Sequence, residues 1–394
     1  MKVNYSLLKK LGSITNDLAL RRALVVFVTM RLSLSLVAAI VLWLHPIPRT
    51  PDERLRPYLG IAPITGGMAE LLLGAWQRFD TMHYLKIATY GYSPEGGSSV
   101  FPPLYPMSIR ILSKAIGNNY LLAALNISNL AYLGMLILLY KLTRQELDEQ
   151  TAWRSMWYIS IFPTAFFLLA AYTEAPFLLF TIAALYCARK GKWNLAGIMA
   201  LLASLTRLQG CILFFPLAYE YLERRDFRLR NLAWSGLSVF SAPVGLGGFV
   251  LFRYFNGYPP LGETYEVHWA STAAFPWESL AKAGRTFWAG RSAPADVLDL
   301  IFVCFFTFLT VIAWRRLPRM YGIYMATTIL FLLSRTNDIH PLLGMSRFVL
   351  SLFPAFILLA IAGQKPLFNR LIVYPSVILL VYLTGQFVMW GWVG

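Results

Sequence analysis

The sequence predicts an all-helical protein that crosses a membrane many times. The chain has 394 residues, of which 57% are hydrophobic and only 14% are charged, whereas soluble domains carry about a quarter charged residues. Apolar runs recur along the whole length, and many approach the roughly 20 residues that a helix needs to cross a bilayer. Because these runs are too long for barrel strands, the predicted fold class is an all-α polytopic membrane protein with one domain, residues 1–394.

We expect about eleven transmembrane helices. Runs at 193–206 and 208–222 are short for full crossings and could form one interrupted helix pair. The first run is followed by no A-x-A-like cleavage site, so it is expected to be a retained anchor rather than a signal peptide. The predicted spans lie at roughly 21–44, 119–141, 155–171, 174–189, 193–206, 208–222, 232–254, 296–314, 319–334, 346–363 and 371–391.

Basic residues set the expected orientation. They cluster before the first run and in alternate connecting loops, for example in ERRDFRLR (223–230) and RRLPR (315–319). By the positive-inside rule these loops and the N-terminus face the cytoplasm. The extracytoplasmic face then holds two long loops, 45–118 and 255–295, and a short loop at 335–346. We therefore assign the net charge of +16 to membrane topology and expect no nucleic-acid partner.

Two amphipathic helices are expected in the first outer loop. Apolar residues recur every three or four positions over 68–79, which gives one apolar face suited to the membrane surface. A second such stretch runs to about Ile116, and the prolines of FPPLYP (101–106) should bar a helix before residue 106. The segment RFDTMHY (78–84) would lie at the end of the first helix.

Charged residues in or beside the apolar runs are candidates for chemistry. Asp80 could take a proton from a hydroxyl group as a general base, or it could be an ordinary helix cap at the interface. Glu174, Arg207 and Arg347 lie near the outer face, where arginine runs against the positive-inside bias and suits an anionic ligand such as a phosphate. The alternative is a structural ion pair, for example between Glu174 and Arg207.

The sequence does not favour a metal site. Histidine and acidic residues of the outer loops, at 263–268 and 338–340, lack the spacing of metal ligands on one helix face. All three cysteines fall inside apolar runs, which excludes a disulfide framework and a zinc site. No Gly-rich phosphate loop follows a strand, so a nucleotide-binding fold is not expected. We expect no metal ion and no cofactor.

Five segments occur together in a recognisable order. They are WQRFDTMHYLKIATYGY (76–92), FPPLYP (101–106), FPTAFFLLAAYTEAPF (162–177), AGIMALLASLTRLQG (196–210) and RFVLSLFPAF (347–356). In this order they resemble the PIG-V family, the GPI mannosyltransferase II-like branch of the GT-C glycosyltransferases. Members of that family usually have Trp-Asp where this chain has Phe79-Asp80, and an aromatic residue where it has His83.

The resemblance implies a GT-C-like fold and a reaction. Such enzymes transfer a sugar from a polyprenyl-phosphate donor on the non-cytoplasmic side, with inversion, and their catalytic acid lies in the first outer loop. By that pattern Asp80 would be the general base, Arg207 and Arg347 would bind the lipid phosphate, and Glu174 would order the site. Further candidates for binding the substrate or the donor phosphate are Arg78, Tyr84 and His340.

The resemblance leaves the substrates partly open. The sugar is expected to be mannose, and the acceptor a glycolipid or glycan, with a protein acceptor also open. The short chain is similar to prokaryotic relatives, so the site would face outside the plasma membrane, with or without an accessory subunit. Two other hypotheses remain: a transporter or flippase for an anionic lipid-linked substrate, and a non-catalytic subunit of a membrane complex.

Overall fold

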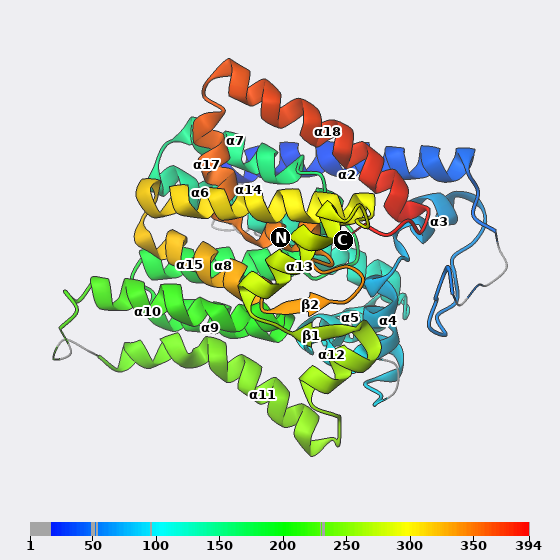
Figure 1. Cartoon of the computed structure of the whole chain (residues 1–394), viewed down its shortest axis with the longest axis horizontal. Coiled ribbons are helices and arrows are strands. Elements are labelled where there is room, and N and C mark those ends of the chain that lie inside the picture. The colour runs from blue at the N-terminus through cyan, green and yellow to red at the C-terminus, as the bar shows by residue number, and fades with distance from the viewer. Residues whose placement is uncertain are drawn as a thin grey trace, which may run out of the picture.

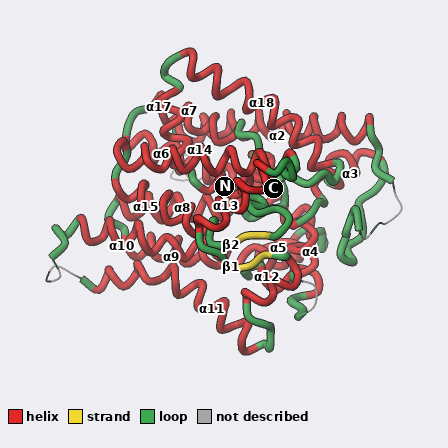
Figure 2. The backbone as a smooth tube through the Cα atoms, viewed as in Figure 1, coloured by secondary structure: helices red, strands yellow, loops and turns green. Residues whose placement is uncertain are grey.

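The computed structural model describes residues 17–48, 52, 54–94, 97–228, 230 and 233–393. The regular structure is mostly helical, as predicted (Figures 1 and 2). The α-helices of the N-terminal half are α2 (Leu18–Leu44), α3 (Gly67–Leu72), α4 (Asp80–Tyr90), α5 (Leu104–Ala115), α6 (Tyr120–Glu146), α7 (Glu149–Ser160), α8 (Glu174–Arg189) and α9 (Trp193–Thr206). Those of the C-terminal half are α10 (Phe214–Glu223), α11 (Ser241–Phe255), α12 (Leu261–Trp269), α13 (Pro276–Trp288), α14 (Pro294–Arg316), α15 (Arg319–Leu332), α16 (Met345–Phe348), α17 (Phe353–Ala362) and α18 (Pro366–Val388).

Short 3₁₀ turns and two strands complete the described structure. Strands β1 (Ser271–Ala273) and β2 (Arg335–Asn337) pair antiparallel, with Ala273 opposite Arg335. This sheet joins the second long outer loop to the short outer loop. The 3₁₀ turns are η1 (Gly74–Trp76), η2 (Ser98–Val100), η3 (Ala165–Leu168), η4 (Leu208–Leu213), η6 (Trp234–Phe240) and η7 (Val349–Ser351).

Five stretches of helix in the described residues are long and apolar enough to cross a membrane. They are α2, α6, η6 with α11, α14 and α18, and a sixth arises if Met345–Ser351 and Phe353–Ala362, bent by 81°, count as one span. The chain is therefore a multi-pass membrane protein, but the expected count of about eleven spans is not confirmed. Several expected spans are shorter helices: α8 has 16 residues, and α9 and α15 have 14 each.

The span expected at 155–171 is wrong. Helix α7 ends at Ser160, and the chain continues through a buried irregular segment that includes η3. Pro163 explains the break, because proline disfavours helical backbone at the residue before it and has no N–H for a helical hydrogen bond. The next residue, Thr164, donates its hydroxyl hydrogen bond to the Ser346 carbonyl, 2.8 Å away. A segment predicted as a span instead ties the first half of the chain to α16.

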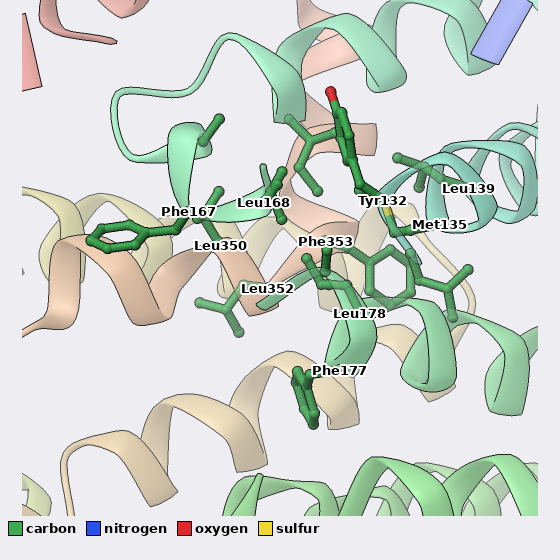
Figure 3. Packing of buried hydrophobic residues seen from close by; sticks show 14 of the residues in the cluster. Tyr132, Met135, Leu139, Phe167, Leu168, Phe177, Leu178, Leu350, Leu352 and Phe353 are labelled. Atoms are coloured by element: carbon green, nitrogen blue, oxygen red, sulfur yellow. The ribbon is translucent and has the colours of Figure 1, made fainter. Parts of the chain in front are cut away.

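The hydrophobic core lies between α6, α8, η3 and the α16–α17 region. Figure 3 shows Tyr132 of α6, Phe177 of α8 and Phe353 of α17 among these buried side chains. Helix α8 packs on α6 and α9, α9 packs on α11, and α2 packs on α6 and α18, which places α11 and α18 on opposite sides of the molecule (Figure 1). The central α8 is therefore surrounded by protein.

The two ends of the molecule contain different sets of loops and short helices. The connections that carry basic residues, such as 316–319 and 363–366, lie at one end, on the left in Figure 1. Helices α3, α4, α5 and α12 lie toward the other end, with the sheet on the same side of the centre. This separation agrees with the predicted division of the loops into two sets.

The first outer loop departs from the predicted pair of surface helices. The expected helix over 68–79 ends at Leu72, and RFDTMHY spans a break and the start of α4 instead of a helix end. Close backbone packing accounts for the break, because a Cβ atom on Gly74 would come within 2.6 Å of the Ile64 carbonyl oxygen. Gln77 holds the same segment, since its side-chain oxygen accepts from the Ile64 N–H at 2.8 Å.

The second helix of this loop begins earlier than predicted. Helix α5 starts at Leu104, with Pro103 at its N-cap and Pro106 in its first turn. The first N–H groups of a helix have no intrahelical partner, so a proline there removes no helical hydrogen bond. The proline cluster therefore begins the helix rather than excluding it.

Candidate active site

Several helix ends meet at one pocket, which has a volume of about 230 Å³. Helix α4 begins beside it, α9 ends beside it, and α16 and both strands contribute to its wall. This meeting point explains why α8 and α9 are short, because they stop next to the pocket instead of continuing through the molecule. The polar and charged lining residues are Asp80, Tyr84, Thr173, Thr206, Arg207, Gln209, Tyr265, Ser271, Arg335, Thr336, Asn337 and Arg347.

Asp80 is the first residue of α4, where the helix dipole favours a carboxylate. The residue before it, Phe79, has φ of 48°, a left-handed value that costs a non-glycine residue about 1–3 kcal/mol. Packing holds this conformation, and the Asp80 N–H donates to the Tyr172 hydroxyl at 3.2 Å. The Phe79 ring lies 5.9, 5.3 and 5.4 Å, between centroids, from the rings of Phe387, Trp390 and Trp392.

Two carboxylates and two arginines form a continuous buried chain at the pocket. Arg347 Nη1 donates to Asp80 Oδ2 at 2.8 Å, and Arg347 Nε lies 3.3 Å from Glu174 Oε1. Glu174 Oε1 also accepts from Arg207 Nη1 at 2.5 Å. We call Asp80, Arg347, Glu174 and Arg207 the pocket network. Its formal charges cancel, as burial of ionised groups requires.

The pocket network keeps unused hydrogen-bonding capacity. Glu174 Oε2 and Arg347 Nε are buried and have no hydrogen-bond partner among the described residues. Asp80 uses Oδ2 for Arg347, and Oδ1 accepts no hydrogen bond from the described part of the chain. Buried polar atoms are usually paired, so unpaired ones beside a pocket indicate groups that a ligand would satisfy.

Tyr84 connects the pocket network to the wall of the pocket. Its hydroxyl lies 3.1 Å from the Thr173 hydroxyl, which in turn accepts from Arg207 Nη1 at 3.3 Å. Burial raises the pKa of the Tyr84 phenol far above its usual range, so this side chain is neutral at physiological pH. The Tyr84 hydroxyl can donate a hydrogen bond, but it does not form the phenolate that would be needed to take up a proton.

Arg335 of β2 is a further cation of the pocket that the sequence analysis missed. Its guanidinium carbon lies 3.2 Å from the centroid of the Tyr265 ring, and its Nη2 donates to the Ser271 carbonyl at 3.2 Å. A signal was available, because Arg335 opens the short outer loop and runs against the positive-inside bias just as Arg207 does. Tyr265 gave no such signal, since 70 positions separate it from Arg335 in the sequence.

Two residues predicted to bind substrate lie away from the pocket. Arg78 is buried and donates to backbone carbonyls, with Nε 2.8 Å from the Val388 oxygen and Nη1 2.8 Å from the Gly74 oxygen. Burial lowers its pKa to about 10, which still leaves it charged at neutral pH. His340 Nδ1 lies 2.8 Å from Asp296 Oδ1, at the N-terminus of α14. Neither lines the pocket, so both are better described as anchors of their loops.

His83 lies behind the pocket wall. Its ring packs on Trp269 and Phe101, and its Nδ1 lies 2.9 Å from the Ser98 hydroxyl. Burial lowers the pKa of His83 to about 4, so the ring is neutral at physiological pH. Among the described residues, no group of three or more His, Cys, Asp or Glu side chains is arranged to hold a metal ion.

The model of the mannosyltransferase (PIG-V) family matches residues 13–234, more than half of the chain. The chain belongs to this family. Three members of the pocket network, Asp80, Glu174 and Arg207, fall within the matched region, whereas Arg335 and Arg347 lie beyond it. No curated relative matches this PIG-V family chain.

Solved structures of two other proteins are similar to this PIG-V family chain. An oligosaccharyltransferase from Archaeoglobus fulgidus, tethered to an acceptor peptide, is 14% identical with a TM-score of 0.45, over 90% of this chain and 55% of that one. ArnT from Cupriavidus metallidurans, bound to undecaprenyl phosphate, is 16% identical with a TM-score of 0.47, over 93% of this chain and 76% of that one. The chain thus spans about half the length of the oligosaccharyltransferase.

Proposed function

We propose that the chain transfers mannose from a polyprenyl-phosphate donor to a hydroxyl group of a glycolipid or glycan, with inversion, at the pocket described above. The observation that carries this proposal is the meeting of Asp80 with three arginines in one pocket of a PIG-V family chain. Transfer from a lipid phosphate needs a base for the acceptor hydroxyl and cations for the leaving group. The pocket offers both within one small space.

The proposed reaction is a single displacement. The acceptor oxygen attacks the anomeric carbon of the sugar and forms the new C–O bond, while the bond from that carbon to the phosphate oxygen breaks. The bonding electron pair leaves with the phosphate, and Asp80 takes the proton of the acceptor hydroxyl. Oδ1 is the oxygen available for this proton, because Oδ2 accepts from Arg347.

The arginines of the pocket would bind the phosphate. Arg207 and Arg347 are held by Glu174, so their guanidinium groups are fixed before the donor arrives. Preorganised donors stabilise a developing charge without reorganisation at the moment of reaction. Tyr84, as a neutral hydroxyl, is suited to hold a sugar hydroxyl or a phosphate oxygen.

The proposed site of action is the extracytoplasmic face of a prokaryotic plasma membrane. The basic connections lie at the end of the molecule away from α3, α4 and α5, and by the positive-inside rule that end faces the cytoplasm. A donor with an insoluble tail would reach the pocket from the membrane. No metal ion is required in this mechanism, because cationic side chains neutralise the phosphate.

The test is turnover by the purified protein in nanodiscs. Polyprenyl-phosphate mannose is supplied with a panel of glycolipid and glycan acceptors, and release of polyprenyl phosphate is measured. We expect turnover in the wild type and a loss of about 10²- to 10⁴-fold in Asp80→Asn, the range of general base catalysis. Donor affinity should stay within a few-fold, because the amide keeps the shape and one acceptor oxygen.

The matched control is Asp338→Asn, an exposed carboxylate of the same outer face that pairs with Lys282. It should turn over like the wild type. Full activity of Asp80→Asn would exclude Asp80 as the base. Saturable donor binding without turnover, together with movement of the lipid between leaflets, would instead support the transporter hypothesis.

A further inference from the structure

The charge balance of the pocket singles out one arginine. Three guanidinium groups, those of Arg207, Arg335 and Arg347, line it, and the neighbouring carboxylates are Asp80 and Glu174. Arg207 and Arg347 are each paired with at least one of those carboxylates at 2.5–2.8 Å. Arg335 makes no ion pair within the described residues, so one positive charge in the pocket is left without an anionic partner.

The other described acids of the outer loops do not supply that partner. Glu263 and Glu266 of α12 are exposed, and Asp338 pairs with Lys282 at 2.5 Å outside the pocket. Asp296 is paired with His340, whose Nδ1 lies 2.8 Å from Asp296 Oδ1. A half-buried guanidinium that faces a pocket and has no carboxylate partner among the described residues is set up to receive an anion.

The local structure fixes Arg335 in this position. Its backbone is in β2, opposite Ala273 of β1, and its carbonyl oxygen accepts from the Ser279 hydroxyl at 3.2 Å. The guanidinium lies against the face of the Tyr265 ring and donates one hydrogen bond to the Ser271 carbonyl. Arginine has five N–H donors, so these contacts leave most of them for a ligand.

We propose that Arg335 is the principal binding group for the phosphate of the lipid donor, and that the β1–β2 sheet positions the Arg335 side chain for this role. This inference rests on the proposed transfer reaction. Arg207 and Arg347 then serve mainly to fix Glu174 and Asp80, and they add donors to the phosphate once it is bound. A phosphodiester donor carries one negative charge, which matches the positive charge of Arg335 that has no anionic partner among the described residues.

The experiment measures lipid binding instead of turnover. Protein is reconstituted in phosphatidylcholine nanodiscs, and quenching of tryptophan fluorescence reports titration with polyprenyl phosphate, with the uncharged polyprenol, or with inorganic phosphate. Trp269 and Trp392 line the pocket and supply the signal. The variants are Arg335→Ala, Arg335→Gln and Arg335→Lys, and Lys282→Ala is the matched control for loss of an outer-face cation outside the pocket.

We expect Arg335→Ala and Arg335→Gln to raise the Kd for polyprenyl phosphate by about 10- to 100-fold, the effect of losing a charge-assisted hydrogen bond. Arg335→Lys should recover part of that affinity, and the Kd for polyprenol should not change in any variant. Competition by inorganic phosphate identifies the phosphate group itself as the determinant, and its weakening in Arg335→Ala is expected. Lys282→Ala should bind like the wild type.

Two results would overturn the proposal. The first is an unchanged Kd for polyprenyl phosphate in Arg335→Ala, when Arg207→Ala or Arg347→Ala loses that binding. The second is an equal loss of polyprenyl phosphate and polyprenol affinity, which would mean that Arg335 only supports the fold. Either result, in a protein that still transfers mannose in an Asp80-dependent manner, refutes the role of Arg335 and leaves the proposed function intact. A wild type that binds polyprenyl phosphate no better than polyprenol would refute both.

Discussion

The two ends of α8 enter two different buried ionic networks. At its first residue, Glu174 belongs to the pocket network, and at its last residue, Arg189 meets Glu146 and Glu220. Arg189 contacts Glu146 through Nε at 2.7 Å and Nη2 at 3.0 Å, and Glu220 through Nη1 at 3.0 Å. Both ends place the charge that the helix dipole favours. We call Glu146, Arg189, Glu220, Arg224 and Tyr321 the clamp network.

The two networks differ in the space beside them, whereas their central carboxylates are similarly buried, with Glu174 5% and Glu220 1% exposed. The clamp network joins the ends of α6, α8, α10 and α15, and none of its residues lines the pocket. Glu220 Oε2 is buried without a hydrogen-bond partner among the described residues, just as Glu174 Oε2 is. An unpaired buried oxygen alone is therefore no sign of a site. The pocket network is distinguished by the pocket beside it and by Arg335, which lines that pocket and has no counter-ion among the described residues.

The strongest way to test this comparison is to neutralise the carboxylate at each end. Glu174→Gln should lower mannose transfer by about 10- to 100-fold, because the amide no longer holds two guanidinium groups by charge. Glu220→Gln should leave transfer within about twofold of the wild type at equal amounts of folded protein. Transfer is measured in nanodiscs, with thermal unfolding recorded for the same samples.

Both variants remove one negative charge from a buried pair, so each is the control for the other. Equal loss of transfer in the two variants, after correction for folded protein, would contradict the separation of a catalytic end from a structural end. Equal retention of transfer would show that Glu174 is dispensable to the pocket.

A second, smaller effect concerns the two arginines of the clamp network. Arg189→Ala leaves Glu146 and Glu220 buried without their shared cation, and we expect it to lower the free energy of unfolding by about 3 kcal/mol. Arg224→Ala should lower it by less than about 1 kcal/mol, because this side chain is 35% exposed and pairs with Glu220 at i,i+4. Denaturant unfolding in detergent measures both, and similar losses would count against a central role for Arg189.

A further expected effect is a pH dependence of stability that arises from His83, which lies behind the pocket wall. Burial lowers the pKa of His83 to about 4 in the folded protein, whereas the unfolded chain has the usual value of about 6.5. Between these values the unfolded state binds more protons, so stability is lost as pH falls from about 6.5 to 4, by at most about 3 kcal/mol. His83→Asn should flatten that part of the stability profile. An unchanged profile in this variant would mean that other groups cause the acid loss.

The sequence predicted the helical class and four charged residues that meet at the pocket, Asp80, Glu174, Arg207 and Arg347, but not Arg335. Arg207, Glu174 and Asp80 could be found because ionisable residues within or beside apolar runs are rare, and such residues can be recognised in the linear sequence. The ion pair between Glu174 and Arg207, considered as an alternative, is present. Whether these residues catalyse transfer stays a prediction.

What the sequence did not predict depends on contacts between distant segments. Hydropathy predicted the helices at 174–189 and 193–206, where α8 and α9 lie, but it did not show that each has one end at the pocket, because helix ends that depend on distant partners carry no local signal. The break before Asp80 arises from packing of Phe79 on the C-terminal segment and of Gly74 on Ile64. The contact of Arg335 with Tyr265 could not be predicted, because the two residues belong to different loops.

The contact of Arg78 with Val388 has a consequence for how the protein is made. The two residues are 310 positions apart, so the ribosome produces the buried guanidinium long before the carbonyl that receives it. At about 5–20 residues per second this interval is roughly 15–60 s, during which the loop before Asp80 lacks its final support. Completion of the pocket therefore waits for the last helix to leave the ribosome, and a nascent chain that stops short of α18 carries Asp80 without the backbone carbonyl that holds the neighbouring Arg78.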